Sequence, residues 1–546
     1  CSTRDGYVYA AGERLGYGEL AATAARQWVP IRPRLKHQDA FSLIGQSPAR
    51  LDIPAKVAGS TRYGADVTLP GMLHAVVLRP PVAGQAGVIR DEAACRAVPG
   101  VRDVFAIDEG IAVVAAGTFA ALEGRARLDV EWAAPTSAPV NGQSLQAALE
   151  AALAGSGRVV AGSGEAVDQP SHSASYFAPF LAHACMEPMN CTVSIANGGC
   201  QIWVGTQDPH GARAVAAQAA GMDPGAVVVH VLPLGGGFGR RAGQDFVREA
   251  VQIARRMKAP VQLLWTREDD LGHGRYREAV GVRTSARVDG AGRPRQVEHF
   301  VASAVPHASV VDPGIGPLMG ADSPIYAFDS ATVRWAGVPV PIPTTIWRSV
   351  GYSYNTFAIE CFIDELAARA GADPLTFRLG LLPDGSPVAR CIEQVAALCR
   401  WTEADGRFLG MSAYQFAQTS VAMVAAVAPD DGTSWRVSDV WCAVDCGTVV
   451  HLDSATAQIE SGVMFGLSAA LFEQVTIAQG AVSSRNFHTY RLARFEDAPD
   501  IHVALLPGTR PPAGLGEAGT PGIAPAVANA LYRLTGERVR ALPLRS

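Results

Sequence analysis

The sequence of 546 residues contains no run of about 18 apolar residues, the length that a helix needs to cross a bilayer. It also lacks a long block of lysine and arginine, and its formal net charge is −5, so neither nucleic acid nor an anionic membrane is an expected partner. No signal-like segment opens the chain. Because it begins at Cys1, without methionine and beside a turn, we expect that part of the protein lies upstream.

The ten cysteines include no pair separated by two residues. Cys185, Cys191 and Cys200 lie near one another, and Cys442 and Cys446 are four apart, but these spacings match neither a zinc site nor an iron–sulfur run. The sequence therefore predicts buried thiols, with a disulfide as the alternative for an exported protein.

The composition, 48% hydrophobic and 18% charged, is that of a globular protein, and the length suggests roughly three or four domains. Strands and helices alternate along most of the chain, which predicts a mixed α+β and α/β multidomain fold. The expected divisions are the end of a preceding domain (1–37), a compact α+β unit (38–135), a linker (136–180) and a strand–helix region in two parts (181–380 and 381–546).

Capping signals predict helices most clearly in the second half of the chain. Asp208-Pro209 supplies an N-cap and a first-turn proline for a helix that Gly221 ends. A strand over 226–234 runs into a glycine cluster, and residues 245–257 have helical spacing. Further helices are expected over 354–370, from Asp373-Pro374, and from Pro525 to Gly536.

The glycine cluster at 235–239 lies between a strand and a helix, where backbone N–H groups can approach an anion closely. It is not a dinucleotide fingerprint, because the sixth residue is Arg240. No glycine–lysine pair follows, so it is not a Walker loop either. A purely structural turn is the alternative interpretation.

Three polar residues could carry chemistry. Glu517, between glycines and before a helix, could be a general base on a rigid turn or a charge that complements the helix dipole. Arg348 could clamp an anion or oxo ligand, or form a salt bridge. Gln207 follows a strand, where α/β ligands usually bind, or is an ordinary loop residue. We interpret His183 and Glu187 as structural, because their spacing alone is weak evidence for a metal.

Six segments occur in a characteristic order: HACMEPMNC, GTQDPHGARAVAAQ, LPLGGGFGRRAGQDFVREA, TIWRSVGYSYNTFAIECFIDELA, VDCGTVVHLDSATAQIESGVMFGLSAALFE and GLGEAGTPGIAPAVANALYRLTGERVRALPL. Together they resemble the xanthine dehydrogenase/aldehyde oxidase family of molybdenum hydroxylases. The Arg240-Arg241 pair and the WRSVG string resemble most the branch of isoquinoline 1-oxidoreductase and membrane-associated aldehyde dehydrogenases.

The resemblance implies a hammerhead domain over 38–135 and molybdopterin-binding domains over 181–380 and 381–546. It implies that Glu517 is the active-site base. It implies a cofactor-binding role for Gln207, Gly236, Gly237, Phe238, Gly239, Arg348 and Gly516. The implied cofactor is molybdenum with molybdopterin, in bacteria usually its cytosine dinucleotide form, held without a direct protein ligand to the metal.

The implied reaction oxidises an N-heteroaromatic or aldehyde carbon with oxygen from water. Because the chain has no iron–sulfur run, haem motif or nucleotide fingerprint, the electrons are expected to leave through a small 2Fe-2S subunit, followed in some relatives by a c-type cytochrome. The resemblance favours a periplasmic or membrane-associated location, with the cytoplasm as the alternative.

Several residues depart from the family pattern. Ala242 and Val350 replace a glutamate and an aromatic residue of purine-oxidising relatives, which disfavours a purine substrate. Met423 and Ala426 replace glutamine and glutamate of close relatives, and the pterin loop of that branch would precede Cys1. A non-catalytic scaffold with the same fold is the alternative that these differences favour. The failed dinucleotide fingerprint disfavours an unrelated flavin or nicotinamide oxidoreductase.

Overall fold

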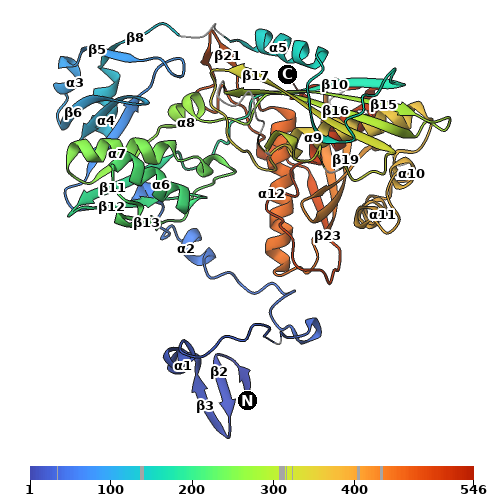
Figure 1. Cartoon of the computed structure of the whole chain (residues 1–546), viewed down its shortest axis with the longest axis horizontal. Helices are drawn as coiled ribbons and strands as arrows, with labels where there is room; N and C mark the ends of the chain where they lie inside the picture. Colours follow the sequence, from blue (N-terminus) through green and yellow to red (C-terminus); the bar gives the residue numbers. More distant parts are fainter. Residues whose placement is uncertain are drawn as a thin grey trace.

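The computed structural model describes the chain apart from residues 34, 136–139, 307–313, 315, 323, 403–405, 431–433 and 546. Three large sheets with helices packed against them form a mixed α/β body (Figure 1), which confirms the predicted fold class. No helix of the described part is both long and apolar enough to cross a membrane.

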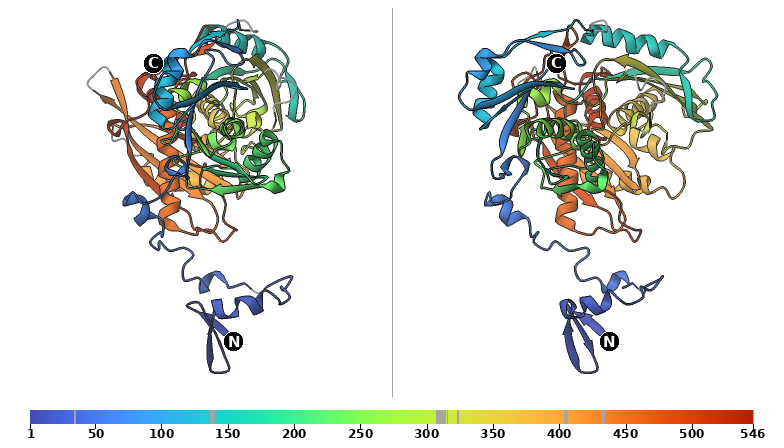
Figure 2. Two further views of the ribbon diagram at one scale, coloured as in Figure 1. Left: turned by 90° about the vertical axis from the view of Figure 1, so that its left-hand side faces the viewer. Right: turned by 60° about the vertical axis from the view of Figure 1, so that its left-hand side comes forward.

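An amino-terminal arm extends away from this body in every view (Figures 1 and 2). It contains the antiparallel strands β1 (Ser2–Arg4), β2 (Tyr7–Ala10) and β3 (Glu13–Gly16), and the helices α1 (Tyr17–Ala24) and α2 (Ile53–Val57). None of the residues in these five elements is buried. The assignment of 1–37 to the end of a preceding domain stays a prediction.

A seven-stranded sheet in the order β13-β12-β11-β14-β4-β7-β6 combines the predicted hammerhead region with the segment that follows it. Its strands are β4 (Leu73–Leu78), β6 (Val101–Ile107), β7 (Gly110–Ala115), β11 (Asn190–Ala196), β12 (Gly199–Val204), β13 (Val227–Val231) and β14 (Val261–Leu264). The two regions join where β14 pairs in parallel with β4, with Val261 opposite Leu73. One sheet therefore crosses the expected domain boundary, and the division into domains remains a prediction.

Both faces of this sheet are covered, because alternate residues of a strand point to opposite sides. Val113 and Ala115 pack with α4 (Thr118–Ala126), whereas Ala112 and Val114 belong to the core beneath α6 and α7. A separate ribbon joins β5 (Gly87–Asp91) to β8 (Asp129–Trp132), and α3 spans Ala93–Arg96.

The capping signals predicted α6 (Pro209–Ala220) correctly. The Asp208 side chain accepts a hydrogen bond from the Gly211 N–H at 2.9 Å, and Gly221 ends the helix in the left-handed conformation. Helix α7 (Asp245–Met257) has the predicted bounds and packs beside α6.

The segment over 136–180, which we expected to be a linker, contains regular secondary structure. It contains α5 (Gly142–Ala154), β9 (Arg158–Gly162) and β10 (His172–Ala178). Leu145, Leu149 and Leu153 recur every fourth residue and are buried on one face of α5, a helical signal that the small, polar composition of the segment concealed.

Strands β9 and β10 form the edges of a five-stranded sheet in the order β10-β15-β16-β17-β9. The inner strands are β15 (Val280–Val288), β16 (Pro294–Pro306) and β17 (Ser330–Val340). Helix α9 (Tyr352–Arg369) shares a buried core with this sheet, and α8 (Arg267–His273) precedes β15. The short hairpin of β21 (Ile477–Ala478) and β22 (Ala481–Val482) belongs to a second core, which it shares with α5 and the strands β16 and β17.

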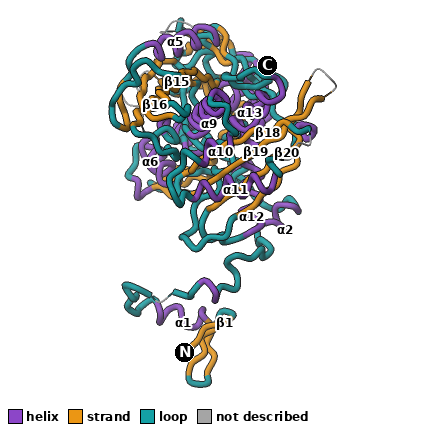
Figure 3. Tube along the Cα trace, turned by 90° about the vertical axis from the view of Figure 1, so that its right-hand side faces the viewer, coloured by secondary structure: helices purple, strands orange, loops and turns teal. Residues whose placement is uncertain are grey.

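A four-stranded sheet, β18-β19-β20-β23, forms the third layer. Its strands are β18 (Phe408–Phe416), β19 (Thr419–Asp430), β20 (Ser434–Asp445) and β23 (Asp500–Leu505), with helices α10 (Pro374–Leu379), α11 (Pro387–Cys399), α12 (Leu452–Leu471) and α13 (Ile523–Thr535) nearby. One face packs on α12 and α13, and the other on α11 (Figure 3). Met423 and Ala426 are fully buried in these two opposite cores, so both are packing residues.

A buried ion pair ties three elements together. The Arg378 guanidinium of α10 donates to the Glu360 carboxylate of α9 at 2.9 Å and to the Met411 carbonyl of β18 at 3.3 Å. The same carboxylate accepts from the Ala413 N–H at 2.8 Å and from the Tyr326 hydroxyl at 2.7 Å. Neither charged side chain is more than 1% exposed.

Replacing Arg378 by methionine would leave the Glu360 carboxylate buried without its cation. We expect Arg378→Met to lower the free energy of unfolding by about 3–5 kcal/mol. The matched control is Arg295→Met, which removes an exposed ion pair to Asp329 and should cost less than about 1 kcal/mol. Urea titrations followed by circular dichroism would measure both, and equal effects would contradict the importance of the buried pair.

Candidate active site

The glycine turn at 235–239 has a strained backbone. Gly236 and Gly239 have φ angles of +99° and +104°, and Phe238 has a φ of +53°, a region that residues with side chains rarely adopt. Such strain persists only where neighbouring groups hold it, and it concentrates at functional sites.

Two hydrogen-bond acceptors and two close approaches hold the turn. The Gly239 N–H donates to Gln207 Oε1 at 3.1 Å, and the Gly235 N–H donates to Glu187 Oε2 at 2.9 Å. A side chain at position 239 would collide with the carbonyl oxygen of Ile346, and one at Gly237 would meet Gln207 Oε1 at 2.6 Å. Glycine is therefore required at position 239, whereas a side chain at position 237 would have to displace the Gln207 side chain from its hydrogen bond with the Gly239 N–H.

Arg241 and Glu187 buttress the turn from behind. The guanidinium of Arg241 is fully buried and donates to the carbonyl of Gly236 at 2.8 Å and to Glu187 Oε2 at 3.1 Å. Burial lowers the pKa of Arg241, and the Glu187 carboxylate opposes that effect. His183 Nε2 lies 2.8 Å from the carbonyl oxygen of Ile346. Glu187 and His183 thus take positions in the scaffold around the turn.

A second strained segment holds Glu517. The Ser349 N–H donates to Glu517 Oε1 at 2.9 Å, and the Ser349 hydroxyl donates to the Glu517 carbonyl at 2.8 Å. The preceding residue, Arg348, donates through Nε to the Gly516 carbonyl at 2.7 Å. Ser349 and Val350 both have positive φ angles, +78° and +49°. The side chain of Glu517 is half-buried.

The Arg348 guanidinium bonds to neutral oxygens in each hydrogen bond described. Besides Gly516, it donates to Ser461 Oγ at 3.0 Å and to the carbonyl and side-chain oxygens of Gln458 at 3.3 and 3.4 Å, both on α12. Burial lowers the pKa of Arg348, and the nearby charge of Glu517 opposes this. In these hydrogen bonds, the positive charge of the Arg348 guanidinium is therefore not paired with a carboxylate.

An aromatic stack connects the two strained segments. The ring of Phe465 on α12 lies 4.6 Å from the Phe238 ring and 4.7 Å from the Trp347 ring. Arg348 Cζ lies 5.6 Å from the Phe465 centroid and 6.0 Å from that of Phe238. Sequence analysis missed Phe465 and Ser349, because one is an apolar residue in an apolar helix and the other acts through its backbone.

The predicted residues thus gather in one place, although their roles remain predictions. One group surrounds the glycine turn, and the other lies where 348–349 meets 516–517. The set consists of Gln207, Gly236, Gly237, Phe238, Gly239, Arg348, Gly516 and Glu517.

The chemistry of this site suits an organic cofactor better than a metal held by side chains. The residues gathered here present glycine backbone, the Gln207 amide, aromatic rings and one guanidinium. Burial raises the pKa of the nearby Cys185 thiol to about 12, so the thiol stays protonated. Among the described residues no group of three His, Cys, Asp or Glu side chains could hold a metal ion.

Comparisons with known proteins agree on one family. Two matches to a molybdopterin cofactor-binding domain cover residues 155–380 and 393–499. The isoquinoline 1-oxidoreductase subunit beta of Brevundimonas diminuta is 34% identical, over 94% of this chain and 69% of that protein. The membrane-bound aldehyde dehydrogenase (pyrroloquinoline-quinone) of Gluconacetobacter polyoxogenes is 28% identical, over 100% of this chain and 78% of that protein.

The fold is also that of a solved structure, quinoline 2-oxidoreductase from Pseudomonas putida 86. The TM-score is 0.80 at 16% identity, and the match covers 92% of this chain and 97% of the other. The chain belongs to the xanthine dehydrogenase/aldehyde oxidase family of molybdenum hydroxylases, as a molybdopterin-binding large subunit. It is a molybdopterin-dependent oxidoreductase and one subunit of a larger enzyme.

The glycine turn gives a direct test of cofactor binding. We expect Gly239→Ala to displace the turn, because the new methyl group meets the Ile346 carbonyl, and to remove most of the bound molybdenum. The control is Gly198→Ala, which also lies at positive φ, +76°, but in open space. It should cost only about 1 kcal/mol of stability and keep the metal. Metal analysis would decide, and full occupancy in Gly239→Ala would contradict the assignment.

Proposed function

We propose that this chain is the catalytic subunit of an enzyme that oxidises a ring carbon of an N-heteroaromatic compound, using water as the source of oxygen. The names of its relatives support a heteroaromatic substrate, since they include isoquinoline and quinoline oxidoreductases. Molybdopterin, when bound, supplies the two-electron acceptor of the reaction. The protein's own residues then bind the cofactor, orient it and move a proton.

Glu517 is the proposed general base. Its Oε1 is fixed by the Ser349 N–H, which leaves the carboxylate one further oxygen with which to take a proton. Its loop is held in turn by the bond from Arg348 to Gly516. The observation that carries the proposal is the position of this half-buried carboxylate. It is anchored on Ser349, and the preceding residue, Arg348, places its guanidinium beside Phe238.

Arg348 and the glycine turn are the proposed cofactor-binding residues. The guanidinium can stabilise an oxo or anionic group, and the turn, with the Gln207 amide beside it, allows a large ligand to approach the backbone. Ala242 and Val350 are both half-buried, and neither side chain can hydrogen-bond to a purine. Their apolar nature supports a less polar substrate.

An aldehyde is the second candidate substrate. The relative from Gluconacetobacter polyoxogenes is named as an aldehyde dehydrogenase and covers the whole of this chain. Turnover of isoquinoline compared with that of benzaldehyde, by the same purified enzyme with an artificial electron acceptor, would separate the two candidates.

We further propose that the electrons leave through a small 2Fe-2S subunit, with a c-type cytochrome as a further acceptor in an exported or membrane-associated complex. A cytosine dinucleotide form of molybdopterin belongs to this proposal. The family resemblance supports the partner subunits and the form of the cofactor. The partner subunits are also supported by the chemistry, because a two-electron reaction needs an electron acceptor and the cysteines of this chain form no iron–sulfur run. A periplasmic or membrane-associated location is proposed on the same basis.

The role of Glu517 predicts a selective loss of activity. We expect Glu517→Gln to keep its molybdenum, because the amide oxygen can still accept from Ser349. Turnover should fall by about 100-fold or more, because the base is lost. The control, Glu460→Gln, changes an exposed carboxylate on α12 and should have normal activity. Normal turnover in Glu517→Gln would refute the assigned role.

The proposed electron path predicts a spectroscopic signal. Purified with its natural partners, the enzyme should show the electron paramagnetic resonance signal of a reduced 2Fe-2S cluster on adding substrate. The Glu517→Gln enzyme should show it only after reduction by dithionite. A wild-type complex that turns over without any iron would contradict this path.

A further inference from the structure

The loop over 514–522, which carries Glu517, becomes more buried along its length. Its first three residues and the side chain of Glu517 are exposed or half-buried, whereas every residue from Ala518 to Gly522 is buried. The carboxylate of a general base has to be held near its productive position by groups that are themselves fixed by packing. The buried half of this loop is the part of it that can provide such support.

Two side chains of strand β18 hold the buried half of the loop from one side. The Tyr414 hydroxyl donates to the carbonyl of Ala518, and the Ser412 hydroxyl donates to the carbonyl of Gly522 at 2.7 Å. Residues two apart in a strand point to the same face, so both hydroxyls reach the loop together. Tyr414 is 4% exposed and Ser412 is fully buried, so these contacts are shielded from water.

The strand lies so close to the loop that the backbone has little freedom there. A side chain at Gly522 would approach the Tyr414 ring to 2.5 Å and the Ser412 hydroxyl to 2.8 Å. A side chain at Gly410, on the same face of β18, would collide with the carbonyl oxygen of Ala526 on α13. The loop therefore cannot move toward β18.

Helix α12 closes the opposite side of the loop. Gly462 and Gly466 are four residues apart and so lie on one face of this helix. A side chain at Gly462 would meet the Cα of Gly519 at 2.8 Å, and one at Gly466 would meet the carbonyl oxygen of Thr520 at 2.6 Å. The backbone of the loop thus packs directly on the backbone of the helix, and it is enclosed between α12 and β18.

Two successive carbonyl groups in the loop are held by two different parts of the chain. The Glu517 carbonyl accepts from the Ser349 hydroxyl at 2.8 Å, and the next carbonyl, that of Ala518, accepts from Tyr414. These two bonds fix the peptide planes that follow Glu517. The Ser349 N–H then holds Oε1 of the side chain itself.

We propose that Tyr414 is a positioning residue for the Glu517 carboxylate, and that its hydroxyl acts by fixing the carbonyl of Ala518. This inference rests on the proposed role of Glu517 as the base. Burial raises the pKa of Tyr414 well above its usual value, so the hydroxyl keeps the proton that it donates. Without this donor the Ala518 carbonyl would be buried and unsatisfied, and the loop would shift to find another partner.

The first test is the turnover of Tyr414→Phe in the complete molybdenum-loaded enzyme. The ring stays in the core and only the hydroxyl is lost. We expect kcat per bound molybdenum to fall by about 10- to 100-fold, the effect of a small misplacement of a reacting group. The KM for isoquinoline and the molybdenum content should not change. An unchanged kcat, or a rise in KM alone, would overturn the positioning role.

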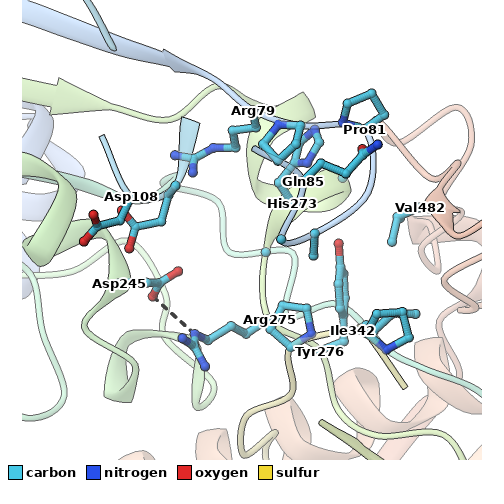
Figure 4. A pocket seen from close by; sticks show the side chains of 18 of the residues that line it. Arg79, Pro81, Gln85, Asp108, Asp245, His273, Arg275, Tyr276, Ile342 and Val482 are labelled. Carbon is cyan, nitrogen blue, oxygen red and sulfur yellow. Dashed lines mark ion pairs between the residues drawn. The ribbon is translucent and has the colours of Figure 1, made fainter. Parts of the chain in front are cut away.

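The matched control is Tyr276→Phe. Tyr276 is also a buried tyrosine whose hydroxyl donates to a backbone carbonyl, that of Leu271 at 2.9 Å. It lines a cavity of about 350 Å³ whose lining includes none of the candidate site residues (Figure 4). This variant loses the same kind of hydrogen bond and should keep the kcat of the wild type. An equal fall of kcat in both variants would overturn the proposal.

Hydrogen–deuterium exchange tests the contact without turnover. The peptide over 514–522 should exchange faster in Tyr414→Phe than in the wild type, because the loop has lost one of its two hydroxyl donors from β18. In Tyr276→Phe the exchange of the same peptide should be unchanged. Equal exchange in Tyr414→Phe and the wild type would show that the hydroxyl does not hold the loop, and would refute the proposal.

A double mutant shows whether Tyr414 acts through Glu517. In an enzyme that already carries Glu517→Gln, adding Tyr414→Phe should lower kcat no further, because no base is left to position. An equal fold-loss in both backgrounds would overturn the proposal. Normal turnover of Glu517→Gln alone would refute the base itself, whereas normal turnover of Tyr414→Phe alone would refute only the positioning role.

Discussion

The geometry of the candidate active site depends on the contact between residues 348–349 and 516–517. Two hydrogen bonds form this contact. The Arg348 side chain donates to the Gly516 carbonyl, and the Ser349 backbone N–H donates to the Glu517 side chain. Because the same arginine lies beside Phe238, this contact also fixes the distance between the acid and the glycine turn. Three segments far apart in sequence thus meet at one candidate site, and two of them have left-handed backbone, at Phe238 and at Ser349 and Val350.

Local signals made much of the fold predictable. The Asp208-Pro209 cap and Gly221 predicted the ends of α6, and the apolar spacing predicted α7. The helix and strands within 136–180 were not predictable in the same way, because the composition of the segment hid the leucine periodicity of α5 and because β9 and β10 are defined by distant partners. Pairing between remote strands leaves little trace in a single sequence.

The difference between local signals and contacts of distant segments also applies to the candidate site. Motif resemblance indicated Glu517, Arg348 and the glycine turn, and the structure brings these residues together. The resemblance could not indicate Phe465 or Ser349. Phe465 contributes an aromatic ring on a helix, and Ser349 contributes a backbone N–H.

The parallel pairing of β14 with β4 has a consequence for biosynthesis. Because Leu73 of β4 pairs with Val261 of β14, the central sheet can form completely only after β14 has been synthesised. The first strands therefore leave the ribosome long before their partner strand is available. During that interval the edge of β4 is exposed to other chains, and a slow-translating cell would depend on chaperones to keep the nascent polypeptide from aggregating.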